Sequence, residues 1–118
     1  MIVHIKGAEA TLEPVADDEH HSGDAVSAYG ALYSSGDGAV EVGLWEVKGE
    51  QSATEQDGYE EVVIVLEGSV EIECEGHTYP LGAGDVLVYD CPIGPKRLRS
   101  EGGFRAAYVV RYRDRAAA

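Results

Sequence analysis

Glu61 is the residue whose surroundings in the sequence point most directly to chemistry. It stands near the start of a run of β-branched residues and leucine, residues 60–67. Two-residue alternation puts Glu61 on the same face as Val63 and Val65, so a strand here carries a carboxylate on an apolar, inward face. Burial raises the pKa of such a carboxylate toward the range used in general acid–base catalysis. Two interpretations stay open: Glu61 transfers a proton in an isomerisation, elimination or hydrolysis, or it pairs structurally with an interior basic or tyrosyl group.

Trp45, Tyr59 and Tyr89 are the aromatic candidates for contacting a ligand. Each is amphipathic, because its ring can pack against an apolar surface while its hydroxyl or indole N–H bonds a polar atom. Such residues also fill the core of a small barrel or the contact between two subunits, and both interpretations stay open. Cys91 has no neighbouring histidine to activate it and follows an acidic residue, Asp90, so we expect an unreactive thiol.

The pattern that positions these residues has a period of two and almost no helical periodicity. The predicted strands are residues 2–5, 40–47, 60–67, 70–75, 78–81, 86–89 and 104–112, with a further strand or helical turn within residues 25–33. Glycine-containing turns are expected at residues 67–69, 76–77 and 82–85. Short antiparallel strands at intervals of roughly 8–12 residues predict an all-β sandwich or barrel.

Length, cysteine content and charge limit the classes of function. The chain has 118 residues, which is room for one domain, and only two cysteines, too few for a disulfide scaffold. It has no apolar run of about 18 residues that could span a membrane and no secretory signal, so we expect a cytoplasmic protein. The net charge of -13 repels nucleic acid and anionic membranes, so we expect neither as a partner.

Three motifs carry a resemblance to a known family. They are Val42-Gly43-Leu44-Trp45-Glu46, then Glu61-x6-Gly68 within EEVVIVLEGSVEI, then Gly84-Asp85 followed by Pro92-Ile93-Gly94. With these motifs, residues 42–112 resemble the cupin superfamily, a small RmlC-like jelly-roll barrel, and within it the single-domain ureidoglycine aminohydrolase-like group. The resemblance implies a barrel whose mouth holds a small ligand, and a homodimer, since small cupins commonly pair.

The histidines that hold the metal of cupin enzymes are missing from this sequence. Such enzymes hold a divalent metal through His-x-His, a following Glu and a later His. The corresponding positions here fall on Glu55 and Asp57, or with a longer spacer on Thr54 and Gln56, and near Pro95 or Arg97. None of the four histidines lies at a ligand position, so we expect no histidine-bound metal and no cofactor of that kind.

A carboxylate site is the alternative that the resemblance leaves open. The ureidoglycine aminohydrolase pattern is Glu-x-His-x3-His, and Glu55-x-Asp57-x3-Glu61 keeps its spacing with carboxylates in place of both imidazoles. Three carboxylates could bind Mn²⁺, Mg²⁺ or Ca²⁺ through oxygen. The other interpretation is that Glu55 and Asp57 are solvated loop residues in an acidic chain.

Arg97 is the candidate for binding an anionic part of the ligand. It follows the Pro-x-Gly turn together with Lys96, near where the missing metal ligand would point. A guanidinium there can hold a carboxylate or phosphate through two hydrogen bonds, or it can pair with surface acids. Both interpretations stay open.

The sequence therefore predicts a small-molecule-binding cupin, with the core in residues 41–113, an N-terminal strand and loop extension in 1–40 and a tail in 114–118. Whether it is an enzyme stays open. One hypothesis is acid–base chemistry by Glu61 on a small polar or anionic metabolite, oriented by Arg97, Tyr59, Tyr89 and Trp45. The alternatives are a non-catalytic binding or accessory protein and a carboxylate-ligated, metal-dependent hydrolase or isomerase.

Overall fold

The computed structural model describes residues 1–15 and 21–113, and nearly all of its regular structure is β-strand. The elements are η1 (Gly7–Glu9), β1 (Glu13–Pro14), β2 (His21–Gly23), β3 (Val26–Ser34), β4 (Val40–Ala53), β5 (Tyr59–Cys74), β6 (His77–Gly82), β7 (Val86–Asp90) and β8 (Lys96–Tyr112). The expected tail, residues 114–118, lies outside the described residues. Among the described residues, no helix is long and apolar enough to cross a membrane.

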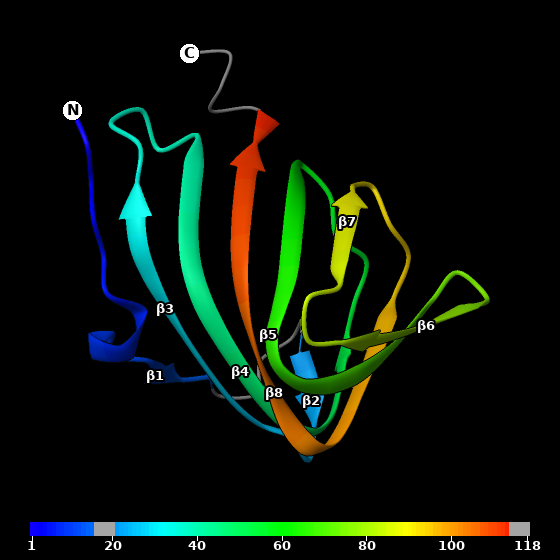
Figure 1. Ribbon diagram of the computed structural model, residues 1–118. Coiled ribbons are helices and arrows are strands. Elements are labelled where there is room, and N and C mark those ends of the chain that lie inside the picture. Colours follow the sequence, from blue (N-terminus) through cyan, green and yellow to red (C-terminus); the bar gives the residue numbers. More distant parts are fainter. Residues whose placement is uncertain (16–20, 114–118) are drawn as a thin grey trace.

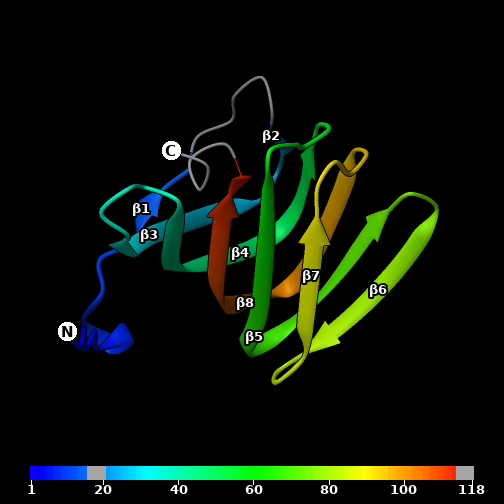
Figure 2. The same cartoon turned by 90° about the horizontal axis from the view of Figure 1, so that it is seen from above.

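Three long antiparallel strands, β4, β5 and β8, carry the architecture. The sheet order is β1-β3-β4-β8-β5-β6, with β2 added on β4 and β7 on β5. The first half of β5 pairs with the second half of β8, and its second half pairs with the first half of β8. Figure 1 shows these strands bending near their middle, so that the two halves of each strand face one another. Seen from above, β7 and β6 flank the two halves of β5 (Figure 2).

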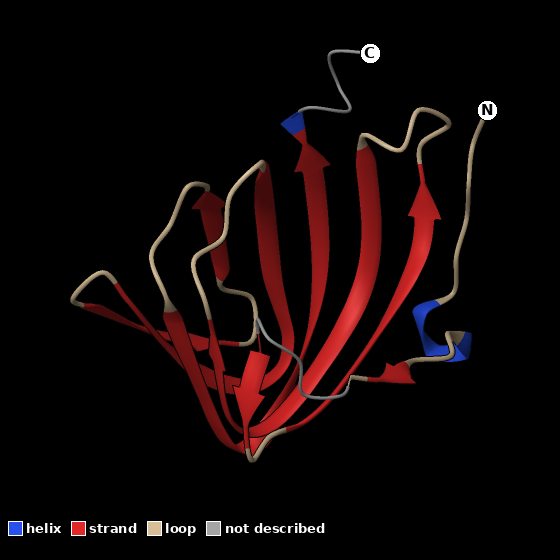
Figure 3. Cartoon of the chain, turned by 180° about the vertical axis from the view of Figure 1, so that it is seen from behind, coloured by secondary structure: helices blue, strands red, loops and turns tan. Residues whose placement is uncertain are grey.

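The bend divides the sheet into two walls. The first wall consists of residues 40–47, 59–65 and 104–112 together with β3 and β7; the second consists of residues 49–53, 70–74 and 96–100 together with β2 and β6. The view from behind shows the same two walls, with the three-residue η1 outside the first (Figure 3). This is the predicted all-β jelly-roll barrel.

Glycines make the bend of β5 and β8, where a turn at residues 67–69 was expected. The strand β5 continues through Gly68, which has a φ of 77°, and the register with β8 shifts on either side of it. A Cβ at Gly68 would lie 2.1 Å from the carbonyl oxygen of Gly103. The residues predicted to form a turn therefore form a bulge inside one long strand. A glycine with positive φ is typical of both a turn and a bulge, so its presence in the sequence did not distinguish them.

Two further predictions from periodicity are corrected at the N-terminal end. Residues 2–5 form no strand, and Ile2 is 94% exposed. The segment that pairs with the edge of β3 is β1, through Glu13↔Tyr29 and Pro14↔Ala28, and residues 2–5 pair with no strand. The ambiguous stretch around residues 25–33 is the strand β3.

The apolar core fills the narrow end of the barrel, where the walls meet. Buried side chains from both walls pack there: Val47, Val63, Val65, Val70, Ile72, Leu98, Phe104 and Ala106. Trp45 packs edge-on against Phe104, with ring centroids 5.2 Å apart. Inward-facing residues further from the bend are left to line a cavity at the wide end.

Candidate functional site

A cavity of about 580 Å³ opens between the two walls at the wide end of the barrel. Its described lining combines aromatic, polar and charged side chains with a few aliphatic ones. The lining residues are Pro14, Val15, Ser27, Tyr29, Glu41, Trp45, Gln51, Gln56, Tyr59, Glu61, Lys96, Leu98, Tyr108, Val110 and Tyr112. A concave site with a few convergent polar groups is typical of small-molecule binding.

Glu61 lies where the alternation predicted. It lines the cavity from the first wall, opposite Tyr89 of β7 and Val110 of β8 in the strand register. Burial raises the pKa of its carboxyl above the ordinary value; the charge of Glu41 raises it further, and Lys96 lowers it in part. The carboxyl of Glu61 therefore holds a proton more readily than an exposed glutamate does.

Lys96 is the basic residue of the cavity. It begins β8 on the second wall, is 7% exposed, and places its ammonium nitrogen 4.0 Å from the centre of the Tyr89 ring. Burial lowers the pKa of this amine, and the carboxylate of Glu61 works against that effect. Among the described residues no carboxylate forms an ion pair with Lys96. The aromatic ring therefore supplies the direct stabilisation of its charge.

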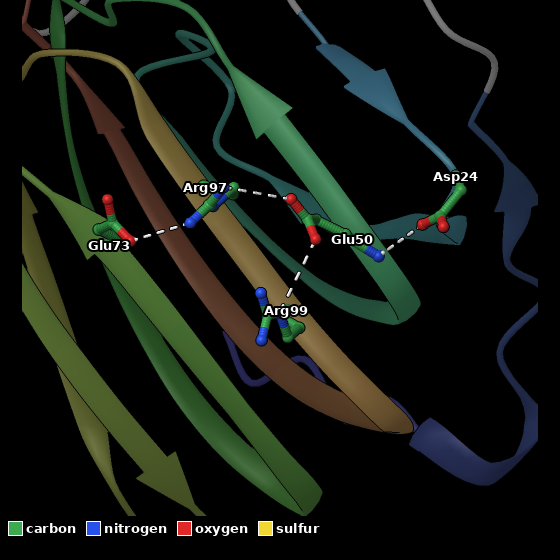
Figure 4. Close-up of polar contacts among 5 residues, drawn as sticks. All are labelled: Asp24, Glu50, Glu73, Arg97 and Arg99. Atoms are coloured by element: carbon green, nitrogen blue, oxygen red, sulfur yellow. Dashed lines mark hydrogen bonds and ion pairs between the residues drawn. The ribbon is translucent and has the colours of Figure 1, made fainter.

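Arg97, expected at the mouth, lies on the outer face of the barrel instead. Its guanidinium forms ion pairs with Glu73 at 3.1 Å and Glu50 at 3.5 Å, and Glu50 also pairs with Arg99 at 3.7 Å (Figure 4). Successive strand residues point to opposite faces, so inward Lys96 requires outward Arg97. The buried Leu98, two residues after Lys96, is the sequence signal that could have identified the inward base.

Glu41 is a cavity residue that the sequence analysis missed. In the strand register Glu41 of β4 and Glu61 of β5 both face Val110 of β8, so the two carboxylates flank one residue of the first wall. The hydroxyl of Tyr108 donates a hydrogen bond of 2.9 Å to Glu41 Oε2. The Tyr108 ring lies over Gly43, where a Cβ would come within 2.4 Å of it. Glu41 lies on the same face of its strand as Gly43 and Trp45, and this two-residue alternation could have predicted its inward position.

The three predicted aromatic contacts separate into two groups. Trp45 and Tyr59 line the cavity. Tyr89 does not; it is 5% exposed and supports Lys96 from within the wall. Burial raises the pKa of the Tyr59 hydroxyl, and the nearby Glu61 charge adds to this. Cys91 is buried, and burial raises the pKa of its thiol, which disfavours the reactive thiolate.

Two polar atoms in the cavity lining have no hydrogen-bond partner among the described residues. They are Ser27 Oγ and Gln56 Oε1, both buried. Leaving a buried polar atom unpaired costs on the order of 1–3 kcal/mol. A ligand or water inside the cavity would remove that cost.

The three carboxylates expected to bind a cation are not brought together. Glu55 and Asp57 are exposed and do not line the cavity, and Asp57 Oδ1 accepts a 2.7 Å hydrogen bond from the backbone N–H of Gly58. Within the part of the chain that the structure describes, no group of three His, Cys, Asp or Glu residues could hold a metal ion. The side chains of residues 1–15 and 22–113 therefore do not fit the divalent metal of cupin enzymes, and the ammonium of Lys96 would repel a cation placed beside Glu61.

Comparison with known proteins assigns the family. Residues 43–110, more than half of the chain, match the family model of the cupin domain. The chain therefore belongs to the cupin family, as its motifs at residues 61–68 and 84–85 implied. No curated protein matches the sequence.

Solved structures with the same architecture are distant in sequence. A predicted oxalate decarboxylase from Thermotoga maritima is 17% identical with a TM-score of 0.76, over 93% of this chain and 99% of that one. The Cnp3 cupin domain of Schizosaccharomyces pombe is 10% identical with a TM-score of 0.72, over 95% and 75%. An ectoine synthase from P. lautus is 21% identical with a TM-score of 0.69, over 94% and 78%. At these identities the likeness shows the fold alone.

Proposed function

We propose that the barrel binds a small metabolite through a carboxylate or similar anionic group that faces Lys96. The observation that carries this proposal is a single basic side chain, buried in the described cavity lining without an ion-pair partner. A desolvated ammonium gains most from an anion that enters the cavity, because electrostatic attraction is stronger there than in water. Glu61 supports the same ligand when protonated, since its hydroxyl can then donate to a carboxylate oxygen.

The test is the thermal shift of the full chain with acetate, propionate and oxalate. We expect these anions to stabilise the wild type and to lose their effect in Lys96→Met, which removes the charge while keeping a long side chain. Lys48→Met is the matched control, because Lys48 is exposed and does not line the cavity. Equal stabilisation of wild type and Lys96→Met would contradict the proposal.

An acid–base enzyme is the second candidate function, favoured by the raised pKa of Glu61 inside the cavity. A carboxyl whose pKa is raised by burial can serve as an acid or a base toward a ligand held by Lys96. The expected result is that Glu61→Gln abolishes turnover of a bound ligand and leaves its affinity within about threefold, a difference of less than 1 kcal/mol. Unchanged turnover in Glu61→Gln would leave binding as the function.

Membership of the ureidoglycine aminohydrolase-like group stays a prediction, as do the homodimer and the cytoplasmic location. The motif positions Glu55 and Asp57 are exposed. The proposed function therefore takes no metal-dependent step from that group and rests on Lys96 and Glu61.

A further inference from the structure

We infer that the ligand of this cavity is a zwitterion, with its carboxylate at Lys96 on the second wall and a cationic group, such as a substituted ammonium, against Glu41 and the aromatic side chains of the first wall. This inference rests on the proposed function and adds the chemistry of the ligand's other end. Three features of the cavity support it: a carboxylate without a basic partner away from Lys96, a surface suited to a cation, and a buried polar atom without a hydrogen-bond partner.

The ammonium of Lys96 lies on the Glu61 side of the cavity, because it sits 4.0 Å from the centre of the Tyr89 ring and Tyr89 pairs with Glu61 in the strand register. Glu41 and Glu61 both belong to the first wall, on either side of Val110. Lys96, the one basic side chain of the described lining, belongs to the second, where its strand neighbours are Ala53 and Cys74. Glu41 lies further along the first wall and forms no ion pair among the described residues, so a ligand with a single negative charge would leave this carboxylate without a cation. A ligand with both charges places an anion at Lys96 and a cation at Glu41.

The first wall can bind a cation through aromatic rings as well as through the carboxylate of Glu41. Tyr29, Trp45, Tyr108 and Tyr112 line the cavity from β3, β4 and β8 of this wall. Aromatic faces attract ammonium groups, and the attraction grows when water is excluded. The 2.9 Å hydrogen bond from the Tyr108 hydroxyl holds the Glu41 carboxylate beside these rings.

An independent observation on the same wall points to a bound molecule. Ser27 lies two residues before Tyr29 on β3, is 5% exposed, lines the cavity, and has no hydrogen-bond partner for its Oγ. A hydroxyl buried in this way is expected to meet a partner. A polar ligand that reaches the first wall would provide one, whereas a small anion held at Lys96 alone would not.

Three probes of matched shape test the inference by isothermal titration calorimetry. Glycine betaine carries both charges, 3,3-dimethylbutanoate has the same shape without the positive charge, and choline has the positive charge without the carboxylate. We expect the wild type to bind glycine betaine about tenfold more tightly than either other probe, the factor that one well-placed cation–aromatic contact supplies.

Variants of the first wall locate the effect. Glu41→Gln should bring the affinity for glycine betaine close to that for 3,3-dimethylbutanoate and leave the latter unchanged. Tyr108→Phe, which removes only the hydroxyl that positions Glu41, should reduce the preference in part, and serves if Glu41→Gln does not fold. Glu71→Gln is the matched control, because Glu71 is exposed on the second wall and does not line this cavity.

The outcomes distinguish the zwitterion inference from the proposed binding of an anion at Lys96. If 3,3-dimethylbutanoate binds as tightly as glycine betaine, or if the preference survives both Glu41→Gln and Tyr108→Phe, the zwitterion inference is overturned and the proposed function stands. If none of the three probes binds while acetate does, the result is the same. If acetate and the three probes all fail to bind, both are overturned.

Discussion

Lys96 and Arg97, consecutive residues of β8, place their positive charges in opposite environments. Arg97 lies on the outer face, half-exposed, and shares its guanidinium between Glu50 and Glu73. Lys96 lies on the inner face with an aromatic ring beneath its ammonium and no ion pair among the described residues. The outer charge is neutralised by the protein itself. The inner charge has no such ion pair among the described residues, and this difference is the basis of the proposal that Lys96 binds an anion.

Reversing the charge should distinguish the two faces most strongly. Lys96→Glu puts a second buried carboxylate near Glu61, so we expect a loss of unfolding free energy on the order of 3–5 kcal/mol. Arg97→Glu, facing water, should cost about 1 kcal/mol or less. Urea denaturation of both variants measures the comparison, and similar losses would show that the inner face is as well solvated as the outer.

Filling the space over Gly43 should come next in size. The Cβ of Gly43→Ala would lie 2.4 Å from the Tyr108 ring, so we expect a loss of about 1–3 kcal/mol. The control is Gly36→Ala, where nothing lies within 4 Å, and its effect should stay within about 0.5 kcal/mol. Chemical denaturation reports both. A neutral Gly43→Ala would mean that Tyr108 does not pack against β4 as described.

The pH dependence of stability sharpens the comparison on the inner face. Because the pKa of Glu61 is raised in the folded state, its ionisation favours the unfolded chain. The stabilisation of the folded state by protonated Glu61 is fully present below the ordinary pKa of 4.5, which applies to the unfolded chain. It is lost as the pH rises through the higher pKa of Glu61 in the folded state. Glu61→Gln should therefore gain stability relative to the wild type as the pH rises from 4 toward neutrality. A difference in melting temperature that does not change with pH would contradict the raised pKa.

The smallest effect is expected on the outer face. Arg97→Ala removes exposed ion pairs, which typically contribute about 0.2–1 kcal/mol and weaken as salt screens them. Denaturation at low and high salt measures this loss, and carboxylate binding should not change. Weaker carboxylate binding in Arg97→Ala would restore the role that the sequence analysis assigned to this residue.

The sequence was most informative where a property depends on the alternation of one strand. Period-two patterning predicted the all-β class and the inward position of Glu61, and the motifs predicted the cupin family that the comparison assigned. The same alternation was available for Lys96 and Glu41. It was not decisive, because alternation separates the two faces of a strand without showing which one is inward; an apolar residue on the same face, such as Leu98 for Lys96, is needed to decide.

Predictions that depended on partners distant in the chain were less successful. The strand expected at residues 2–5 does not form, and β1, later in the chain, pairs with the edge of β3 at residues 28–29. The turn at residues 67–69 became a bulge because β8 runs alongside both halves of β5. The cluster of Glu55, Asp57 and Glu61 did not form because the first two residues precede β5 and face solvent.

By itself, the sequence determined where most strands lie and which face of its strand carries Glu61, because both follow from backbone geometry within a few residues. Only the tertiary structure decided that Glu41 and Glu61 flank Val110 and that Lys96 approaches the Tyr89 ring from the opposite wall. These arrangements depend on the register between strands far apart in the chain and on the bend that turns one sheet into two facing walls. No local pattern encodes either.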